Sequence, residues 1–129
     1  MIAGIGVDIV DIARIQALLD RYGERFLRRV YTKAETDYAM SGVNKAERLA
    51  GRFAVKEAMM KALGTGKSQG ILWRDVETLR GRSGKPEVHL RGQAVKWAKM
   101  RGGGAVHASI THDGGKAMAF VILEKAVRA

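Results

Sequence analysis

The order of the periodic segments constrains the fold of this chain more than any other feature of its sequence. Apart from one apolar run at the start and one short helical pattern near residues 93–100, helical patterns come before residue 64 and alternating strand patterns come after residue 74. Helices and strands grouped in this way favour an α+β fold, in which helices pack on one face of a mostly antiparallel sheet. We predict that architecture for a single domain over residues 1–129, a length typical of one domain.

Capping residues and apolar periodicity predict the helices. They run from Asp11 to near Gly23, from Lys33 onward, from about Lys45 to Leu63 and from Gln93 to Met100. Asp11 is placed to cap the first helix. Thr32 and Glu35 form a capping-box pattern at the second, and Gly64 is placed to end the longest.

Short apolar runs and alternation predict the strands. They cover residues 2–10, 75–80, 86–91, 105–111 and 116–124. Asp113-Gly114-Gly115 is a hairpin signal between the last two strands. In the strand before it, Ile110 is expected to face one side of the sheet and Thr111 the other.

Composition excludes several classes of protein. The chain has no cysteine, which excludes a disulfide framework, Cys-based zinc sites and thiol catalysis. No apolar run approaches the about 20 residues that a membrane span needs. The N-terminus lacks the basic and long apolar regions of a signal peptide. We therefore expect a soluble, cytoplasmic protein with no membrane partner.

The charge of the chain points to an anionic partner. Lys and Arg number 23 against 13 acidic residues, a formal net charge of +10. Such a field attracts nucleic acid, anionic membrane, or an acidic protein or ligand. A basic nucleic-acid-binding protein without enzymatic activity is thus an alternative function. The few aromatic residues and the lack of an RNA-binding signature argue against it, so no nucleic acid is expected.

Residues that could bind a ligand or take part in catalysis occur in three places. Asp8 follows an apolar run, where it either binds a ligand or merely precedes the next helix. Glu57 and Lys61 share a helix face, as a metal-binding carboxylate beside a phosphate-binding ammonium or as an ordinary surface ion pair. Thr111 and His112 end a polar strand face, where His112 either contacts a phosphate or ribose or is a solvated turn residue.

Taken together, these segments resemble the holo-acyl-carrier-protein synthases, the short single-unit type of 4′-phosphopantetheinyl transferase. The matching segments are Gly4–Val10, Arg52–Ala58 with Lys61 and Gly64–Gly66, Gly84–Pro86 and Ser109–His112. The resemblance extends from Gly4 to about Ile122. It implies the phosphopantetheinyl transferase fold and a homotrimer with active sites at the subunit interfaces.

The resemblance also implies roles for single residues. Asp8 and Glu57 match metal-binding carboxylates, and Lys61 matches a lysine near the coenzyme A phosphates, so these three are the expected catalytic residues. The residues implied for coenzyme A binding are Arg52, Lys61, Gly64, Thr111 and His112. Arg14 matches a basic residue on the helix that docks the carrier protein. A non-catalytic trimeric scaffold, in which the carboxylates are dispensable, is the third alternative.

Elementary chemistry agrees with these roles. Mg²⁺ commonly takes one or two protein carboxylates plus substrate phosphates, a number that Asp8 and Glu57 match. In the implied reaction a serine hydroxyl attacks the β-phosphorus of coenzyme A and releases adenosine 3′,5′-bisphosphate, with Lys61 adding positive charge at the phosphate oxygens. Either Glu57 or a metal-held water takes the serine proton.

The arginines near the first helix offer a surface for an acidic partner. Arg14, Arg21 and Arg25 are the expected partner-binding residues, and Arg14 and Arg21 are seven apart, on one helical face. A solvated arginine face is the alternative. We expect this face to steer and dock an acidic acyl carrier protein, mainly through the association rate.

Overall fold

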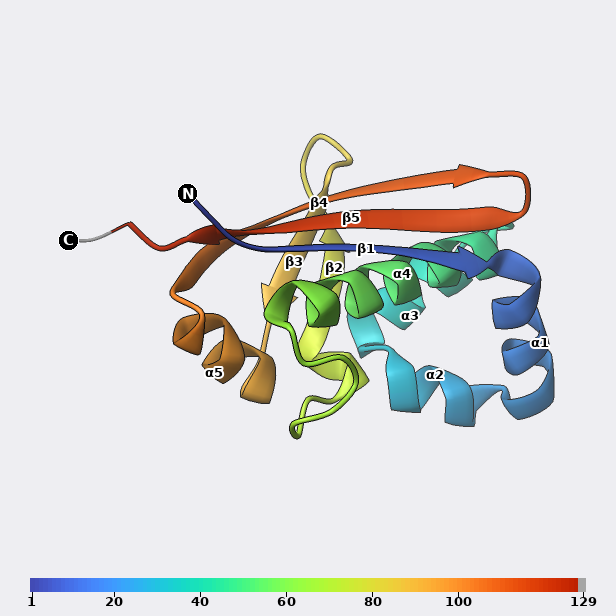
Figure 1. Ribbon diagram of the computed structural model, residues 1–129. Coiled ribbons are helices and arrows are strands. Elements are labelled where there is room, and N and C mark those ends of the chain that lie inside the picture. The colour runs from blue at the N-terminus through green and yellow to red at the C-terminus, as the bar shows by residue number, and fades with distance from the viewer. Residues whose placement is uncertain (128–129) are drawn as a thin grey trace.

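The structure is a computed structural model that describes residues 1–127, and Figure 1 shows its elements. The helices are α1 (Ile12–Tyr22), α2 (Glu24–Val30), α3 (Lys33–Met40), α4 (Lys45–Leu63) and α5 (Gly92–Met100), with a 3-10 turn, η1, at Trp73–Asp75. The strands are β1 (Ile2–Asp11), β2 (Val76–Arg80), β3 (Pro86–Leu90), β4 (Gly103–Asp113) and β5 (Lys116–Lys125).

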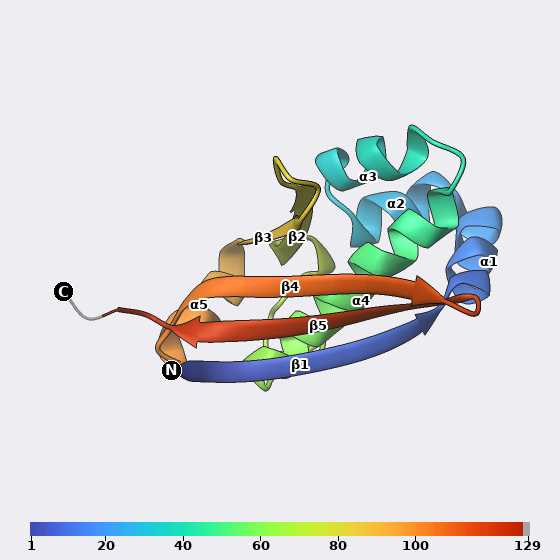
Figure 2. The same ribbon diagram turned by 90° about the horizontal axis from the view of Figure 1, so that it is seen from above.

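Strands β1, β5 and β4 form an antiparallel sheet with β5 in the centre, and β2 and β3 form a separate antiparallel pair. The helices lie on one face of the larger sheet, with α4 beneath it (Figures 1 and 2). The predicted α+β class and antiparallel pairing are confirmed. The prediction of a single sheet was wrong, because β2 and β3 run across the direction of the larger sheet and cannot align with β4.

Helix α4 forms the centre of the core. Of its 19 residues, 14 are buried, since the sheet covers one side and α1, α3 and β2 pack against the others. Small residues recur every fourth position, at Ala54, Ala58 and Ala62, which lets the backbone of β1 approach the helix closely. The C-terminal end of α4 is therefore held firmly against β1.

The sheet face that points away from the helices carries apolar side chains. These are Ile5, Val7, Ile9, Met118 and Phe120, which are 40–54% exposed. No helix or strand of residues 1–127 covers this face (Figure 2). The predicted alternation in β4 is confirmed, because Ile110 packs on the core while Thr111 is exposed.

Most predicted helix boundaries are confirmed. Thr32 and Glu35 form the expected capping box, and Gly64 ends α4 in the left-handed conformation at φ 78°. The prediction that the Asp11 side chain caps the first helix was wrong. Asp11 occupies the N-cap position, but its carboxylate pairs with Lys116 instead of the helix backbone. This ion pair is available because Asp11 faces Lys116 across the β1–β5 register.

Two further features differ from the sequence prediction. Helix α2 was missed because it is a short helix directly after α1, from which Gly23 at φ 53° separates it. Strand β1 continues one residue beyond the predicted 2–10, through Asp11, and Asp8 lies within it. Among residues 1–127, no helix is both long and apolar enough to cross a membrane.

Candidate active site

Two glycines bring β1 unusually close to α4. A Cβ atom added at Gly6 would lie 1.7 Å from the carbonyl oxygen of Ala58, and one added at Gly4 would lie 2.1 Å from that of Ala62. Only a residue without a side chain fits at these distances, so the glycine spacing of the first motif has a packing cause. Asp8 is on the same face of β1 as Gly6, and the strand therefore carries it against α4.

Asp8, Glu57 and Lys61 meet where β1 crosses α4. Lys61 Nζ lies 2.9 Å from Asp8 Oδ1 and also donates a hydrogen bond to the carbonyl of Val7 at 3.1 Å. Within residues 1–127, Asp8 Oδ2 is buried and accepts no hydrogen bond. The ordinary surface pair of Glu57 with Lys61 is not formed among these residues, because Lys61 turns to Asp8.

The environment of Glu57 disfavours its charged form. Burial raises the pKa of Glu57 from 4.5 to about 7, and the adjoining Asp8 carboxyl adds to this effect. Arg14 and Lys61 act in the opposite direction and only partly offset it. Two carboxyl groups thus lie side by side, although each raises the electrostatic cost of ionising the other.

This pair of carboxylates fits a magnesium ion. The unpartnered Asp8 Oδ2 and the adjoining Glu57 carboxylate are hard oxygen donors, which Mg²⁺ prefers. Residues 1–127 contain no group of three or more His, Cys, Asp or Glu side chains placed to hold a metal. A cation at Asp8 and Glu57 would therefore take its remaining ligands from water and from substrate phosphates.

A cavity of about 250 Å³ opens beside the carboxylates. It is lined by Glu57, Met60, Lys61, Gly66, Lys67 and Trp73. Gly64 directs the chain into this cavity, since its N–H donates to the carbonyl of Lys61 and its positive φ turns the chain out of the helix. Two lysines and an apolar wall thus surround a space next to the carboxylate pair.

The other residues implied for coenzyme A binding lie elsewhere on the chain. Arg52 is buried under the ring of Tyr38, 4.2 Å from its centroid, and burial lowers the pKa of Arg52. His112 lies beside the N-terminal half of α4, 3.8 Å from Glu47. Thr111 is on the face of the sheet that points away from α4. A single chain therefore holds the predicted site residues in separate groups.

Arg14, Arg21 and Arg25 are exposed on α1 and α2. The guanidinium of Arg14 lies 5.7 Å from the centroid of Phe53, close enough to the carboxylates to influence Glu57. Between the two helices runs a groove of about 410 Å³, lined by Leu18, Tyr22, Arg25, Phe26 and Arg29. The groove combines an apolar floor with an arginine rim, which suits an amphipathic acidic surface.

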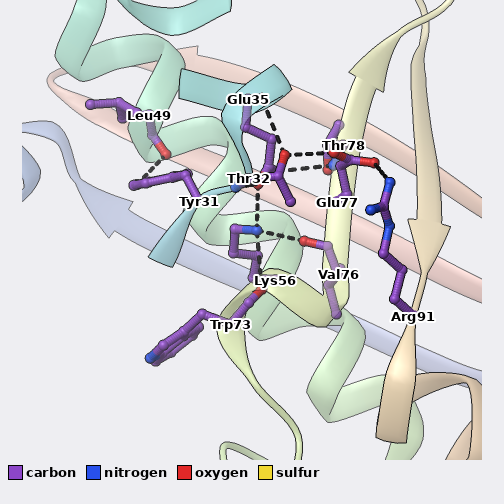
Figure 3. A network of polar contacts seen from close by, with 10 residues as sticks. All are labelled: Tyr31, Thr32, Glu35, Leu49, Lys56, Trp73, Val76, Glu77, Thr78 and Arg91. Carbon is purple, nitrogen blue, oxygen red and sulfur yellow. Dashed lines mark hydrogen bonds and ion pairs between the residues drawn. The ribbon is translucent and has the colours of Figure 1, made fainter. Parts of the chain in front are cut away.

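Sequence reasoning missed the role of Lys56, which is fully buried. Its Nζ lies 2.7 Å from Glu35 Oε1 and donates to the carbonyl oxygens of Trp73 and Val76 (Figure 3). The available signal was the apolar surroundings of Lys56 in a core helix, which require a buried partner of opposite charge.

The known proteins that resemble this chain belong to one family. Residues 4–118 match the family described as the 4′-phosphopantetheinyl transferase superfamily. A holo-[acyl-carrier-protein] synthase of Solibacter usitatus is 47% identical over 124 residues, covering 96% of this chain and 99% of the relative. A synthase of the same name from Koribacter versatilis is also 47% identical, with the same coverage.

Solved structures of holo-[acyl-carrier-protein] synthases are also similar to this chain. The crystal structure of the synthase from Neisseria meningitidis has a TM-score of 0.87 and 35% identity, covering 97% of this chain and all of the other. That of Helicobacter pylori, in complex with coenzyme A, has a TM-score of 0.82 and 32% identity, with 93% and 99% covered. The chain therefore belongs to the 4′-phosphopantetheinyl transferase superfamily, among the holo-[acyl-carrier-protein] synthases.

Proposed function

We propose that this chain transfers the 4′-phosphopantetheine group of coenzyme A to a serine of an apo acyl carrier protein. The observation that carries the proposal is the Asp8–Glu57 pair beside Lys61, with an unpartnered carboxylate oxygen and an open cavity alongside. The names of the relatives and the coenzyme A bound to the Helicobacter pylori protein support it.

In this reaction the serine Oγ forms a bond to the β-phosphorus of coenzyme A, and the bond from that phosphorus to the bridging oxygen breaks. The serine gives up its proton to Glu57 or to a metal-held water beside it, and adenosine 3′,5′-bisphosphate leaves. Mg²⁺ held by Asp8 and Glu57 would polarise the pyrophosphate and neutralise the leaving group. Lys61, which Asp8 Oδ1 holds at 2.9 Å, directs a further positive charge toward the same phosphates.

The same proposal includes a homotrimer with active sites between subunits. An uncovered apolar sheet face is expected to bind another surface, and a second copy of this chain is the occupant that would also complete the site. The separation of Arg52 and His112 from Glu57 supports shared sites, in which one copy supplies the carboxylates and its neighbour the remaining residues. The number of three copies follows from the family resemblance.

Subunit complementation tests the shared site. Glu57→Gln and His112→Ala each remove a residue from a different group, so each variant alone is expected to be almost inactive. Mixed trimers would contain some sites with both residues intact, and mixing with subunit exchange should restore part of the activity. A mixture that stays as inactive as its components would argue for sites built within one chain.

The arginine-rimmed groove between α1 and α2 is our candidate for the carrier-protein surface. Charge reversal at Arg21 and Arg25 should raise the KM for the carrier protein and leave the KM for coenzyme A unchanged, because neither residue reaches the cavity. Equal KM values for the carrier protein in variant and parent would contradict this assignment. The cytoplasmic location expected from the sequence remains a prediction.

Intact-mass spectrometry tests the activity directly. Apo acyl carrier protein incubated with this chain, coenzyme A and Mg²⁺ should gain the mass of one phosphopantetheine group. The gain should disappear with EDTA and return when Mg²⁺ is restored. A folded protein that modifies none of several acyl carrier proteins would contradict the proposal.

A further inference from the structure

The cavity beside Glu57 has two walls of different origin. Helix α4 supplies Glu57, Met60 and Lys61, while the chain after the helix supplies Gly66, Lys67 and Trp73. The beginning of the second wall is tied to the helix, because the N–H groups of Thr65 and Gly66 donate to the carbonyl of Met60. The next residues, 67–70, are exposed. Beyond them Ile71 is buried in the core, and the N–H of Leu72 donates to Asp75, so that Trp73 lies between anchored residues.

Lys56 holds this segment at Trp73 itself and at Val76. Its Nζ donates to the carbonyl of Trp73 at 3.1 Å and to that of Val76 at 2.5 Å, and it pairs with Glu35 at 2.7 Å (Figure 3). An ammonium has three protons, so each contact uses one of them. This buried group therefore joins α4 to α3 and to the start of β2 at a single point.

Glu35 is held as firmly as Lys56. Its Oε1 also accepts from the N–H of Thr32 at 3.0 Å, and its Oε2 accepts from the N–H of Thr78 at 3.0 Å. Both side chains of the pair have 0% exposure. The Lys56 ammonium and the Glu35 carboxylate are thus both hydrogen-bonded on every side. Such a buried ion pair favours one arrangement of the segments it joins, because breaking it leaves a charge without a partner.

The fixed segment places an aromatic wall next to the carboxylates. The indole of Trp73 stacks on Phe53, with centroids 5.0 Å apart and an interplanar angle of 28°. Phe53 is one helical turn before Glu57 on the same face of α4. Lys67 Nζ lies 5.6 Å from the centroid of the Trp73 ring. A displacement of Trp73 would therefore remove the aromatic wall of the cavity. It would also separate the indole ring from the ammonium of Lys67.

We infer that Lys56 is a positioning residue: through Trp73 it holds the wall of the cavity against which coenzyme A binds. The inference rests on the proposed function, since coenzyme A is taken as the ligand of this cavity. Lys56 itself is fully buried and touches no substrate. Its effect is expected on the binding of coenzyme A and not on the docking of the carrier protein, which is proposed to use the α1–α2 groove, a surface lined by neither Lys56 nor Trp73.

The main test compares kinetic constants. The double variant Lys56→Met/Glu35→Gln removes both charges together, so that neither is left buried alone. We expect the KM for coenzyme A to rise about tenfold, with the KM for the carrier protein unchanged. Trp73→Leu, which keeps the backbone carbonyl that Lys56 uses, should raise the KM for coenzyme A to a similar extent.

Arg91→Met is a matched control. Arg91 pairs with Glu77 at 2.5 Å in the neighbouring part of the same network but has no contact with Trp73 among the described residues (Figure 3). It should lower stability while leaving both KM values unchanged. A Trp97→Phe background makes Trp73 the sole tryptophan, and the double variant should then increase acrylamide quenching of its fluorescence.

Chemical rescue tests the ammonium itself. The chain has no cysteine, so Lys56→Cys can be aminoethylated selectively in denaturant and refolded, which restores an ammonium at the length of lysine. The aminoethylated protein should recover the parent KM for coenzyme A, and the carbamidomethylated protein should not. Unchanged coenzyme A KM values in the double variant and in Trp73→Leu would overturn the inference while the parent still transfers phosphopantetheine. Failure of the parent would overturn the proposed function instead.

Discussion

Lys56 and Glu57 of α4 are neighbours in sequence, but their charged side chains lie in opposite electrostatic environments. Lys56 is fully buried, faces an opposite charge at 2.7 Å and uses all its protons. Glu57 is half-buried beside a like-charged carboxyl, and the neighbouring Asp8 oxygen has no partner within residues 1–127. The first arrangement stabilises one packing of the chain, while the second leaves room for the cation that the proposed function requires.

The difference teaches how one helix can serve structure and chemistry together. A buried ion pair with satisfied hydrogen bonds resists rearrangement, because breaking it leaves an uncompensated charge. Two carboxylates held close together repel each other, so the pair favours the binding of a proton or a cation. Since Lys56 and Glu57 point to different sides of α4, the rigid side holds the segment that borders the reactive side.

Removal of the reactive carboxylate should give the largest effect. If Glu57 holds the metal as proposed, Glu57→Gln is expected to lower kcat/KM by about a thousandfold, because it removes a charged group that would act in the transition state. The free energy of unfolding without metal should not fall, since the variant removes the repulsion from Asp8. Transfer assays and urea unfolding measure the two quantities. Glu87→Gln, at an exposed glutamate, is the control, and a destabilised Glu57→Gln would contradict the comparison.

Lys56→Met should have the largest effect on stability. It leaves Glu35 buried without its counter-ion, and the expected loss is about 3–5 kcal/mol in the free energy of unfolding. Urea unfolding followed by circular dichroism measures the loss, and adding Glu35→Gln should recover part of it. If Lys56→Met cost no more than Lys33→Met, whose lysine side chain is 89% exposed, the pair would not have the structural role described here.

The two positions should also differ in their response to pH and Mg²⁺. The pKa of Glu57 is about 7 in the fold and near 4.5 when the chain is unfolded, so the folded state holds more protons between these values. Stability from this group is therefore greatest below pH 4.5 and falls as the pH rises toward 7.

At the proposed site, Mg²⁺ would have to displace the proton of Glu57 at pH 6 but not at pH 8. The rise in Tm on adding Mg²⁺ should therefore be larger at pH 8, as measured by differential scanning fluorimetry. Glu57→Gln should abolish the rise at both pH values. A rise of equal size at pH 6 and pH 8 would contradict the linkage.

Lys61→Met should have the smallest effect on stability. Its side chain is 55% exposed, although its partner Asp8 is only 9% exposed, so the loss should exceed that of a surface pair but stay below that of Lys56→Met, where both partners are fully buried. The KM for coenzyme A should nevertheless rise, because the phosphates lose a positive charge. Lys45→Met, at the other end of α4, is the control. A stability loss as large as that of Lys56→Met would erase the distinction between the two sides of the helix.

The sequence alone predicted much of this molecule through local patterns. Apolar periodicity and capping residues predicted α4 and the capping box at Thr32, and alternation predicted β4 and β5. The family motifs led to Asp8, Glu57 and Lys61, which the structure brings together. These features depend on residues close in sequence or on short motifs, and both can be read directly from the chain.

Only the tertiary structure decided the relations between distant residues. It joined Lys56 to Glu35, stacked Trp73 on Phe53, and separated Arg52 and His112 from the carboxylates. It also turned Lys61 from Glu57 to Asp8, although the helix spacing suited the nearer partner. The physical reason is that such contacts depend on how closely β1 and the segment after α4 pack against the helix, and no local pattern encodes that distance.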